Sequence, residues 1–294
     1  MKFVVPLTVV LLCAVVGSQL KEIRPYFDTL RMEARAALSM PRNTPKPVFS
    51  DTSTAREADC PSPRETLLIV AGGQSNAGNY NSNLSASLPN ERVFTFFDGK
   101  CYVAQDPMLG AEGTRGSLWP PLGADLARRL DRPVMFILAA AGGTRYSDWT
   151  ATRAPYLDRL RAQISAAKQR RFTPALIIWH QGESDGLASP RAQQVEHDLH
   201  ALASQIMQAA PDAEFYMFQA SRCIGPKRAS QSGEVRKAQA AVADTVPRIK
   251  LGFDTDTLGD DYRWDKCHFN RFGRQEIVSK AAADIERLFN LAAP

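Results

Sequence analysis

Leu67-Leu68-Ile69-Val70-Ala71-Gly72-Gly73-Gln74-Ser75-Asn76-Ala77-Gly78 is a continuous apolar run that ends in a turn of small residues. This pattern predicts a buried strand followed by a tight turn. A serine on such a turn stands clear of the sheet, and the backbone N–H groups beside it can face a developing oxyanion. Ser75 is therefore a candidate nucleophile, although a plain connection or a phosphate-binding loop would use the same glycines.

Four more apolar runs follow and alternate with segments whose apolar residues recur at helical spacing. The runs lie at 134–138, 175–179, 214–218 and 249–253. Continuous apolar strands between amphipathic helices are typical of a parallel sheet that is covered on both faces. We predict an α/β fold, a three-layer α/β/α sandwich with a mainly parallel sheet of about five strands. A β-hairpin around Asp98-Gly99 is expected on the surface of this domain.

The chain has 294 residues, of which 44% are hydrophobic, and this is enough for one sizeable core. We expect a single domain over 64–294. Residues 19–63, which become rich in Pro, Ser and Thr, are expected to form a stalk or linker before it. The formal net charge of +5 is spread thinly along the chain, so a nucleic-acid partner is not expected.

Residues 1–18 have the pattern of a secretory signal. Met1-Lys2 precedes an apolar stretch, and this stretch ends in Gly17-Ser18. The protein is therefore expected to be exported, either to a periplasm or out of the cell. If the segment stays uncleaved, it would tether the protein to a membrane.

Four cysteines remain beyond this segment, an even number that is consistent with disulfides in an oxidising compartment. They are Cys60, Cys101, Cys223 and Cys267. Three pairings are open, and a Cys223–Cys267 bridge would fasten the segment that carries His268. Neither a close Cys-x-x-Cys pair nor a His-Glu-x-x-His sequence is present, and His197 and His200 have no obvious third ligand, so no metal or other cofactor is expected.

Asp265-Lys266-Cys267-His268 places a carboxylate three residues before one of only four histidines. In a loop or one helical turn, this spacing lets the Asp265 side chain accept a hydrogen bond from one imidazole nitrogen while the other nitrogen faces a serine. An Asp–His pair can also be ordinary surface polarity. The catalytic interpretation of the pair is favoured because Ser75 lies on a predicted turn at a strand end.

Two more clusters follow predicted strands. Gly142-Gly143-Thr144 comes after 134–138, and His180-Gln181-Gly182-Glu183-Ser184-Asp185 comes after 175–179. The carboxyl ends of parallel strands meet at one edge of the sheet, where sites gather. We expect the N–H of Ser75, an N–H of the glycine pair and the side-chain amide of Gln181 to form an oxyanion hole. The alternative is that the glycines form a turn and Gln181 caps a helix.

Together these blocks resemble the SGNH (GDSL-like) hydrolases, and within them the branch of sialate O-acetylesterases and carbohydrate esterase family 6. The motifs are Gly-Gln-Ser-Asn at 73–76, Gly-Gly-Thr at 142–144, Gln-Gly-Glu-Ser-Asp at 181–185 and Asp-x-x-His at 265–268. The resemblance spans roughly 66–290 and makes 64–294 an esterase domain of the SGNH type.

The resemblance also implies roles for single residues. Ser75 would be the nucleophile, His268 the general base and then acid, and Asp265 the residue that orients the imidazole. The oxyanion would be bound by the N–H groups of Ser75 and Gly143 and by Gln181. Glu183 and Asp185 are expected to brace loops. Candidate substrate-binding residues are Asn76, Thr144, Arg145 and Trp149.

These inferences lead to an exported serine esterase that removes small acyl groups, chiefly acetyl, from a carbohydrate without a cofactor. The acetyl preference and the acetylated carbohydrate partner come from the resemblance. The same residues would serve an acyltransferase that passes the acetyl group to a second sugar hydroxyl. A carbohydrate-binding protein without turnover is the other alternative, and the oligomeric state stays open.

Overall fold

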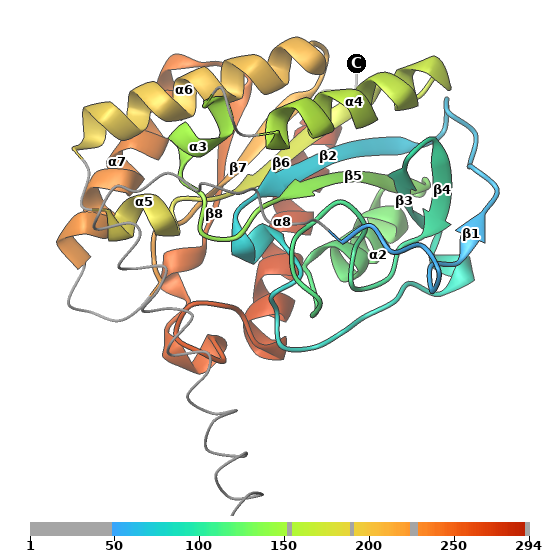
Figure 1. The fold of residues 1–294 in the computed structure, drawn as a ribbon, viewed down its shortest axis with the longest axis horizontal. Helices are drawn as coiled ribbons and strands as arrows, with labels where there is room; N and C mark the ends of the chain where they lie inside the picture. The colour runs from blue at the N-terminus through green and yellow to red at the C-terminus, as the bar shows by residue number, and fades with distance from the viewer. Residues whose placement is uncertain (1–48, 152–154, 189–190, 224–228, 292–294) are drawn as a thin grey trace, which may run out of the picture.

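The computed structural model describes residues 49–151, 155–188, 191–223 and 229–291. They form one eight-stranded sheet between two layers of helices (Figure 1). The strands are β1 (Glu57–Ala58), β2 (Leu67–Gly73), β3 (Val93–Phe97), β4 (Lys100–Val103), β5 (Val134–Ala140), β6 (Pro174–His180), β7 (Glu214–Gln219) and β8 (Ile249–Asp254). Their order in the sheet is β1-β4-β3-β5-β2-β6-β7-β8, which places β2 near the centre.

Helices cover both faces of this sheet. They are α2 (Trp119–Arg129), α3 (Tyr146–Thr150), α4 (Tyr156–Gln169), α5 (Glu183–Leu187), α6 (Ala192–Ala209), α7 (Ala229–Thr245) and α8 (Arg271–Leu291). Side chains of α4, α6 and α7 pack on one face, together with Leu68 and Val70 of β2. Side chains of α2 and α8 pack on the other face, against Leu67 and Ile69. Because neighbouring residues of β2 point to opposite buried faces, an unbroken apolar run was the correct signal for this strand.

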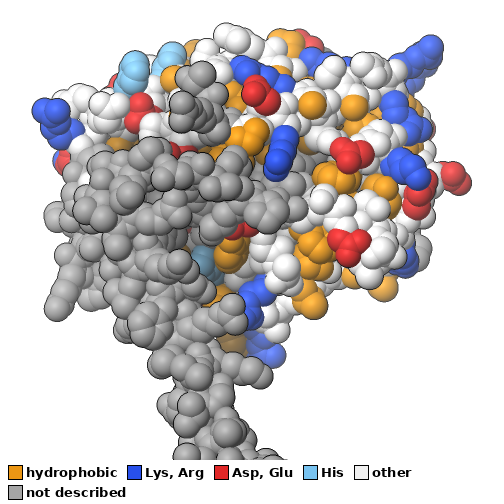
Figure 2. Space-filling model, in the orientation of Figure 1, with side chains coloured by type: hydrophobic (Ala, Val, Ile, Leu, Met, Phe, Trp, Pro, Cys, Tyr) orange, Lys and Arg blue, Asp and Glu red, His pale blue; other side chains and the backbone are white. Residues whose placement is uncertain are grey.

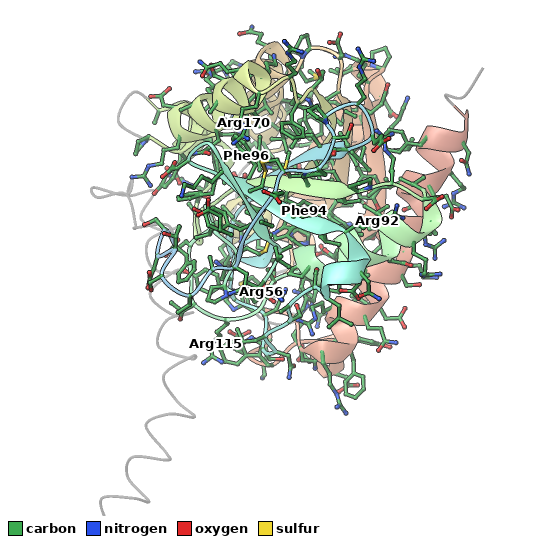
Figure 3. All side chains as sticks on the ribbon, turned by 90° about the vertical axis from the view of Figure 1, so that its right-hand side faces the viewer. Arg56, Arg92, Phe94, Phe96, Arg115 and Arg170 are labelled. Atoms are coloured by element: carbon green, nitrogen blue, oxygen red, sulfur yellow. A yellow bond between two sulfur atoms is a disulfide. The ribbon has the colours of Figure 1, made fainter. Side chains whose placement is uncertain are left out.

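The three-layer α/β/α fold is confirmed, but the sheet is wider than the predicted five strands. The predicted runs correspond to β2, β5, β6, β7 and β8. The predicted hairpin, β3–β4, extends the sheet rather than lying apart on the surface, because β3 also pairs in parallel with β5 through Val93 and Val134. Figure 3 looks onto this side of the molecule, with Phe94 and Phe96 of β3 labelled. Six neighbouring strands, from β3 to β8 in the sheet order, therefore pair in parallel, and β4 pairs antiparallel with both β3 and β1 at one edge.

Residues 49–63, part of the predicted linker, contact the domain. The N–H of Phe49 donates to Ala111 O, and Glu57 of β1 pairs with Tyr102 of β4. A disulfide joins Cys60 to Cys101. These residues belong to the folded unit, while the position at which a linker ends stays a prediction.

The second disulfide joins Cys223 to Cys267. This is the pairing that fastens the segment carrying His268, so the structure selects one of the three pairings that the sequence left open.

On the face shown in Figure 2, Lys and Arg side chains are interspersed with Asp and Glu side chains where the surface is described. Among the described residues, none of the helices is both long and apolar enough to span a membrane. The predicted signal or anchor at 1–18 lies outside the described residues.

Candidate active site

Ser75 lies at the carboxyl end of the central strand, in the short 3-10 helix η1 (Ser75–Ala77) that follows β2. The chain can turn there because Gly73 has φ +133°, and a Cβ at this position would stand 2.0 Å from His180 O. The Ser75 side chain is buried, and its Oγ makes no hydrogen bond to any described residue. A buried hydroxyl without a partner costs about 1–3 kcal/mol, and such groups in native proteins call for a functional explanation.

Asp265 and His268 form the predicted pair. His268 Nδ1 lies 2.6 Å from Asp265 Oδ2, and the backbone N–H groups of His268 and Cys267 both donate to Asp265 Oδ1. Burial alone would raise the pKa of Asp265, but His268 and these N–H groups lower it below its usual value. An ionised Asp265 holds the imidazole with Nδ1 protonated, which leaves Nε2 as the basic nitrogen.

Two aromatic rings flank the His268 imidazole. The ring of Tyr80 stacks on it with centroids 5.2 Å apart, and the Trp264 ring stacks at 6.1 Å. Nε2 does not bond to Ser75 Oγ in this ligand-free structure. Catalytic hydrogen bonds of this kind often tighten only when substrate is bound.

Neighbouring residues nevertheless bring the serine and histidine segments together. Asn76 Nδ2, next to the nucleophile, donates to Cys267 O, next to His268, at 3.3 Å. A Cβ at Gly142 would lie 3.1 Å from Ser75 Cβ and 3.0 Å from the hydroxyl of Tyr80, the residue that stacks on His268. The three predicted blocks around Ser75, Gly142 and His268 therefore meet at one place.

The predicted oxyanion donors have free backbone N–H groups. Within the described residues, the N–H groups of Ser75 and Gly143 make no hydrogen bond. The N–H of Gly142, the residue before Gly143, donates to Glu112 Oε2 at 2.7 Å, and this bond orients the loop after β5. Gly143 has φ +71°, a left-handed conformation that glycine adopts without strain.

Gln181, the third predicted donor, is fully buried and already has partners. Its Nε2 donates to Thr144 O at 3.0 Å, and its Oε1 accepts from Trp179 Nε1 at 2.9 Å. A carboxamide nitrogen carries two hydrogens, so one N–H of Gln181 remains beyond the bond to Thr144.

Three of the four candidate substrate-binding residues are fully buried, and their side chains contact other residues of the protein. Asn76 bonds to Glu183 and Cys267, and the Thr144 hydroxyl donates to Ala141 O. Trp149 packs between Tyr156 and Trp179 in the core, and its Nε1 donates to Thr144 Oγ1. The structure therefore does not place the Trp149 ring in a sugar pocket, because the hydrophobic core takes up this side chain. Arg145 is partly exposed beside Asp148.

Glu183 is fully buried and contacts Asn76, the residue after Ser75. Its Oε1 accepts from Asn76 Nδ2 at 2.6 Å and lies 3.5 Å from His180 Nδ1. Burial raises the pKa of Glu183, and the hydrogen bond from Asn76 opposes this shift. Burial also lowers the pKa of His180 to about 3, so His180 is neutral near pH 7.

Arg263 was missed by sequence reasoning. Its Nη1 donates to Cys267 O at 2.5 Å, its Nη2 donates to Thr255 O at 2.9 Å, and its guanidinium lies over the Phe269 ring. Burial lowers the pKa of Arg263 to about 10, and Glu183 opposes this shift. Arg263 therefore positions the residue before His268. The only signal in the sequence was its place two residues before Asp265.

A cavity of about 420 Å³ lies beside the carboxyl end of β5. Its walls include Phe97, Leu138, Ala139, Ala140 and Tyr156 but none of Ser75, Asp265 and His268. The candidate site therefore rests on the geometry of its residues, not on this cavity. No group of three or more His, Cys, Asp or Glu side chains that could hold a metal ion occurs among the described residues.

The family of the chain comes from a comparison of its sequence with models of protein families. A family model described as carbohydrate esterase, sialic acid-specific acetylesterase, matches residues 65–286. The chain belongs to this family. The match covers β2 through most of α8, and therefore all four motif blocks. Membership in the sialic acid-specific acetylesterase family makes the protein a carboxylic ester hydrolase of the SGNH type.

Solved structures share the fold of this member of the acetylesterase family. A protein from Arabidopsis thaliana is 15% identical with a TM-score of 0.60, over 75% of this chain and 97% of that one. A GDSL-like lipase from Parabacteroides merdae is 12% identical with a TM-score of 0.52, over 74% and 94%. The protein NanS is 18% identical with a TM-score of 0.50, over 80% and 100%. No match was found among curated protein sequences.

Proposed function

We propose that the protein removes O-acetyl groups from a carbohydrate through a Ser75-His268-Asp265 triad and an acyl-enzyme. The observation that carries the proposal is the short Asp265–His268 bond on a segment that is bonded to the residue after Ser75, whose buried Oγ has no hydrogen-bond partner among the described residues. Membership in an acetylesterase family supports the reaction and the class of substrate.

In the first half of the reaction, Ser75 Oγ attacks the ester carbonyl carbon and its proton passes to His268 Nε2. Asp265 stabilises the imidazolium that forms. The negative oxygen of the tetrahedral intermediate accepts from the N–H groups of Ser75 and Gly143, with the remaining N–H of Gln181 Nε2 as the proposed third donor. Each such donor contributes roughly 3 kcal/mol to transition-state stabilisation.

The intermediate then collapses. The bond between the carbonyl carbon and the sugar oxygen breaks, and this oxygen takes the proton from His268. Water, deprotonated by His268, attacks the carbonyl carbon of acetyl-Ser75. The bond between this carbon and Ser75 Oγ then breaks, Ser75 Oγ takes the proton back from His268, and acetate leaves. Arg145, the partly exposed member of the four candidates, is proposed to contact the substrate, while Asn76, Thr144 and Trp149 support the loops around it.

We also propose that the protein is exported. Two disulfides are typical of proteins from an oxidising compartment, and residues 1–18 have the pattern of a secretory signal.

The test is acetate release from a small aryl acetate and from acetylated sugars by the wild type, Ser75→Ala and Ser184→Ala. Ser184 is a matched control, because its Oγ is also buried and has no hydrogen-bond partner within the described part of the chain. Loss of at least 10³-fold in kcat with Ser75→Ala and retention with Ser184→Ala would support the proposal. Equal rates for all three proteins would contradict it. Acetyl groups found on an added acceptor sugar instead of in free acetate would favour an acyltransferase.

A further inference from the structure

The guanidinium of Arg115 stacks on Trp264, an aromatic residue that contacts the proposed general base, His268. The guanidinium carbon of Arg115 stands 4.6 Å from the centroid of the Trp264 ring, and Trp264 in turn stacks on the His268 imidazole. Arg115 is exposed, and Trp264 is partly exposed. Figure 3 shows Arg115 at the surface of the molecule.

The guanidinium of Arg115 has no polar partner within the described part of the chain. Its side chain contacts the Trp264 ring, and no described carboxylate lies within ion-pair distance of the guanidinium. A structural arginine would normally use its five N–H donors on carbonyl or carboxylate oxygens, as Arg263 does in the same region. The donors of Arg115 are instead available to a ligand.

Hydrogen bonds nevertheless hold both the backbone of Arg115 and the Trp264 ring on which its guanidinium stacks. The backbone N–H of Arg115 donates to Asn79 O at 2.9 Å, and Trp264 Nε1 donates to Tyr80 O at 3.1 Å. Asn79 and Tyr80 follow η1, which carries Ser75. The segment after the nucleophile therefore holds both the arginine and the ring beneath it. A stacked, oriented guanidinium loses less entropy on binding than a freely rotating one.

We propose that Arg115, supported by Trp264, is a specificity-determining residue that binds the carboxylate of an acetylated sugar acid while the ester lies at Ser75. This inference rests on the proposed function. The planar fork of a guanidinium matches a carboxylate with two parallel hydrogen bonds, which a neutral sugar cannot supply. Cation–π stacking leaves the edge of the guanidinium open for these bonds.

The test uses the full-length protein and three substrates: 4-nitrophenyl acetate, an acetylated neutral methyl hexoside and an acetylated sugar acid such as an O-acetyl sialic acid. For Arg115→Gln we expect KM for the acetylated sugar acid to rise about tenfold or more, with kcat/KM for the two neutral esters within about twofold of the wild type. Arg115→Lys keeps the positive charge but not the planar fork, so its KM for the acetylated sugar acid should lie between those of the wild type and Arg115→Gln.

Arg92→Gln is the matched control for net charge. Arg92 directly precedes β3, pairs with Asp131 and lies far from Arg115 in Figure 3. This variant should leave KM for all three substrates unchanged.

Two results would overturn the inference while the proposed function stands: an unchanged KM for the sugar acid in Arg115→Gln, or an equal loss for all three esters, which would show an effect through Trp264 and His268. A wild type that cleaves none of the three esters would instead contradict the proposed function.

Discussion

Asn76 Nδ2 donates to the carbonyl oxygen of Cys267, so the residue after the proposed nucleophile is bonded to the residue before the proposed base. The same nitrogen donates to Glu183 Oε1, and Arg263 donates to the same Cys267 carbonyl. This buried network connects the serine turn and the histidine loop, which are far apart in the sequence. We infer that it sets the distance between Ser75 and His268.

Glu183→Ala is expected to lower kcat by about 10²-fold, because a displacement of the catalytic groups by about 1 Å can cost that much. The unsatisfied Asn76 donor should also lower the free energy of unfolding by about 1–3 kcal/mol. Glu183→Gln keeps an acceptor oxygen and should retain most of the activity. Steady-state kinetics with an aryl acetate measures the difference, and equally active Ala and Gln variants would show that Glu183 does not position the site.

The two disulfides should differ in their effect on activity. They span 41 and 44 residues, so replacing either pair by alanines should cost a similar free energy of unfolding, about 4 kcal/mol. Only the loss of Cys223–Cys267 should also lower kcat, because Cys267 adjoins His268. The measurement is kcat per folded molecule at a temperature where both variants are folded. A similar kcat for both would separate the second bridge from catalysis.

Asp106 is expected to make stability depend on pH. Its buried carboxylate accepts from Ser85 and Ser117, and burial raises its pKa from 3.8 to about 6 against these hydrogen bonds. The folded state therefore binds more protons than the unfolded state between about pH 4 and 6, and this contribution to stability is lost as the pH rises through 6. Relative to Asp106→Asn, the wild type should lose on the order of 3 kcal/mol over this range.

Chemical denaturation of the wild type and Asp106→Asn at several pH values from 4 to 7 tests this prediction. The difference between the two proteins is the required quantity. His180, whose pKa is lowered to about 3, changes wild-type stability in the opposite direction, because protonation of the unfolded state removes stability as the pH falls below 6.5. A wild-type-minus-variant difference that stays constant with pH would contradict the assignment to Asp106.

Trp149→Phe should affect stability and not substrate binding. The substitution removes the bond to Thr144 Oγ1 and part of the packing on Trp179, so we expect a loss of about 1–3 kcal/mol in the free energy of unfolding. KM for an acetylated sugar should stay within about twofold. A large rise in KM with little change in thermal stability would instead place the ring in contact with substrate.

Sequence patterns predicted the parts of the fold that depend on local order. The apolar runs of β2, β5, β6, β7 and β8 were visible because both faces of these strands are buried. The incorporation of β3 into the sheet was not visible, because a hairpin has the same pattern whether or not its first strand pairs with a third one. The pairing of Cys223 with Cys267 also depends on tertiary contacts, so the sequence could only leave it among three alternatives.

For the candidate site, the sequence predicted segments that the structure brings together, but not all of the contacts between them. Asp265 and His268 are three residues apart, and a local turn is enough to join them. The interior position of Trp149 depends on where α3 packs. Arg263 is only four residues from Cys267, but the direction of its guanidinium also depends on the bond to Thr255 O and on packing over the Phe269 ring. Neither is encoded in a short motif.

The most direct test of the Ser75 mechanism is covalent trapping. Ser75 Oγ should displace 4-nitrophenolate from diethyl 4-nitrophenyl phosphate and form a stable diethylphosphoryl ester, which peptide mass spectrometry locates. We predict one adduct, on the peptide that contains Ser75, with acetate release falling in step with labelling, and no adduct on the Ser75→Ala protein. Adduct formation at another residue in parallel with inactivation, or full esterase activity in Ser75→Ala, would contradict the account.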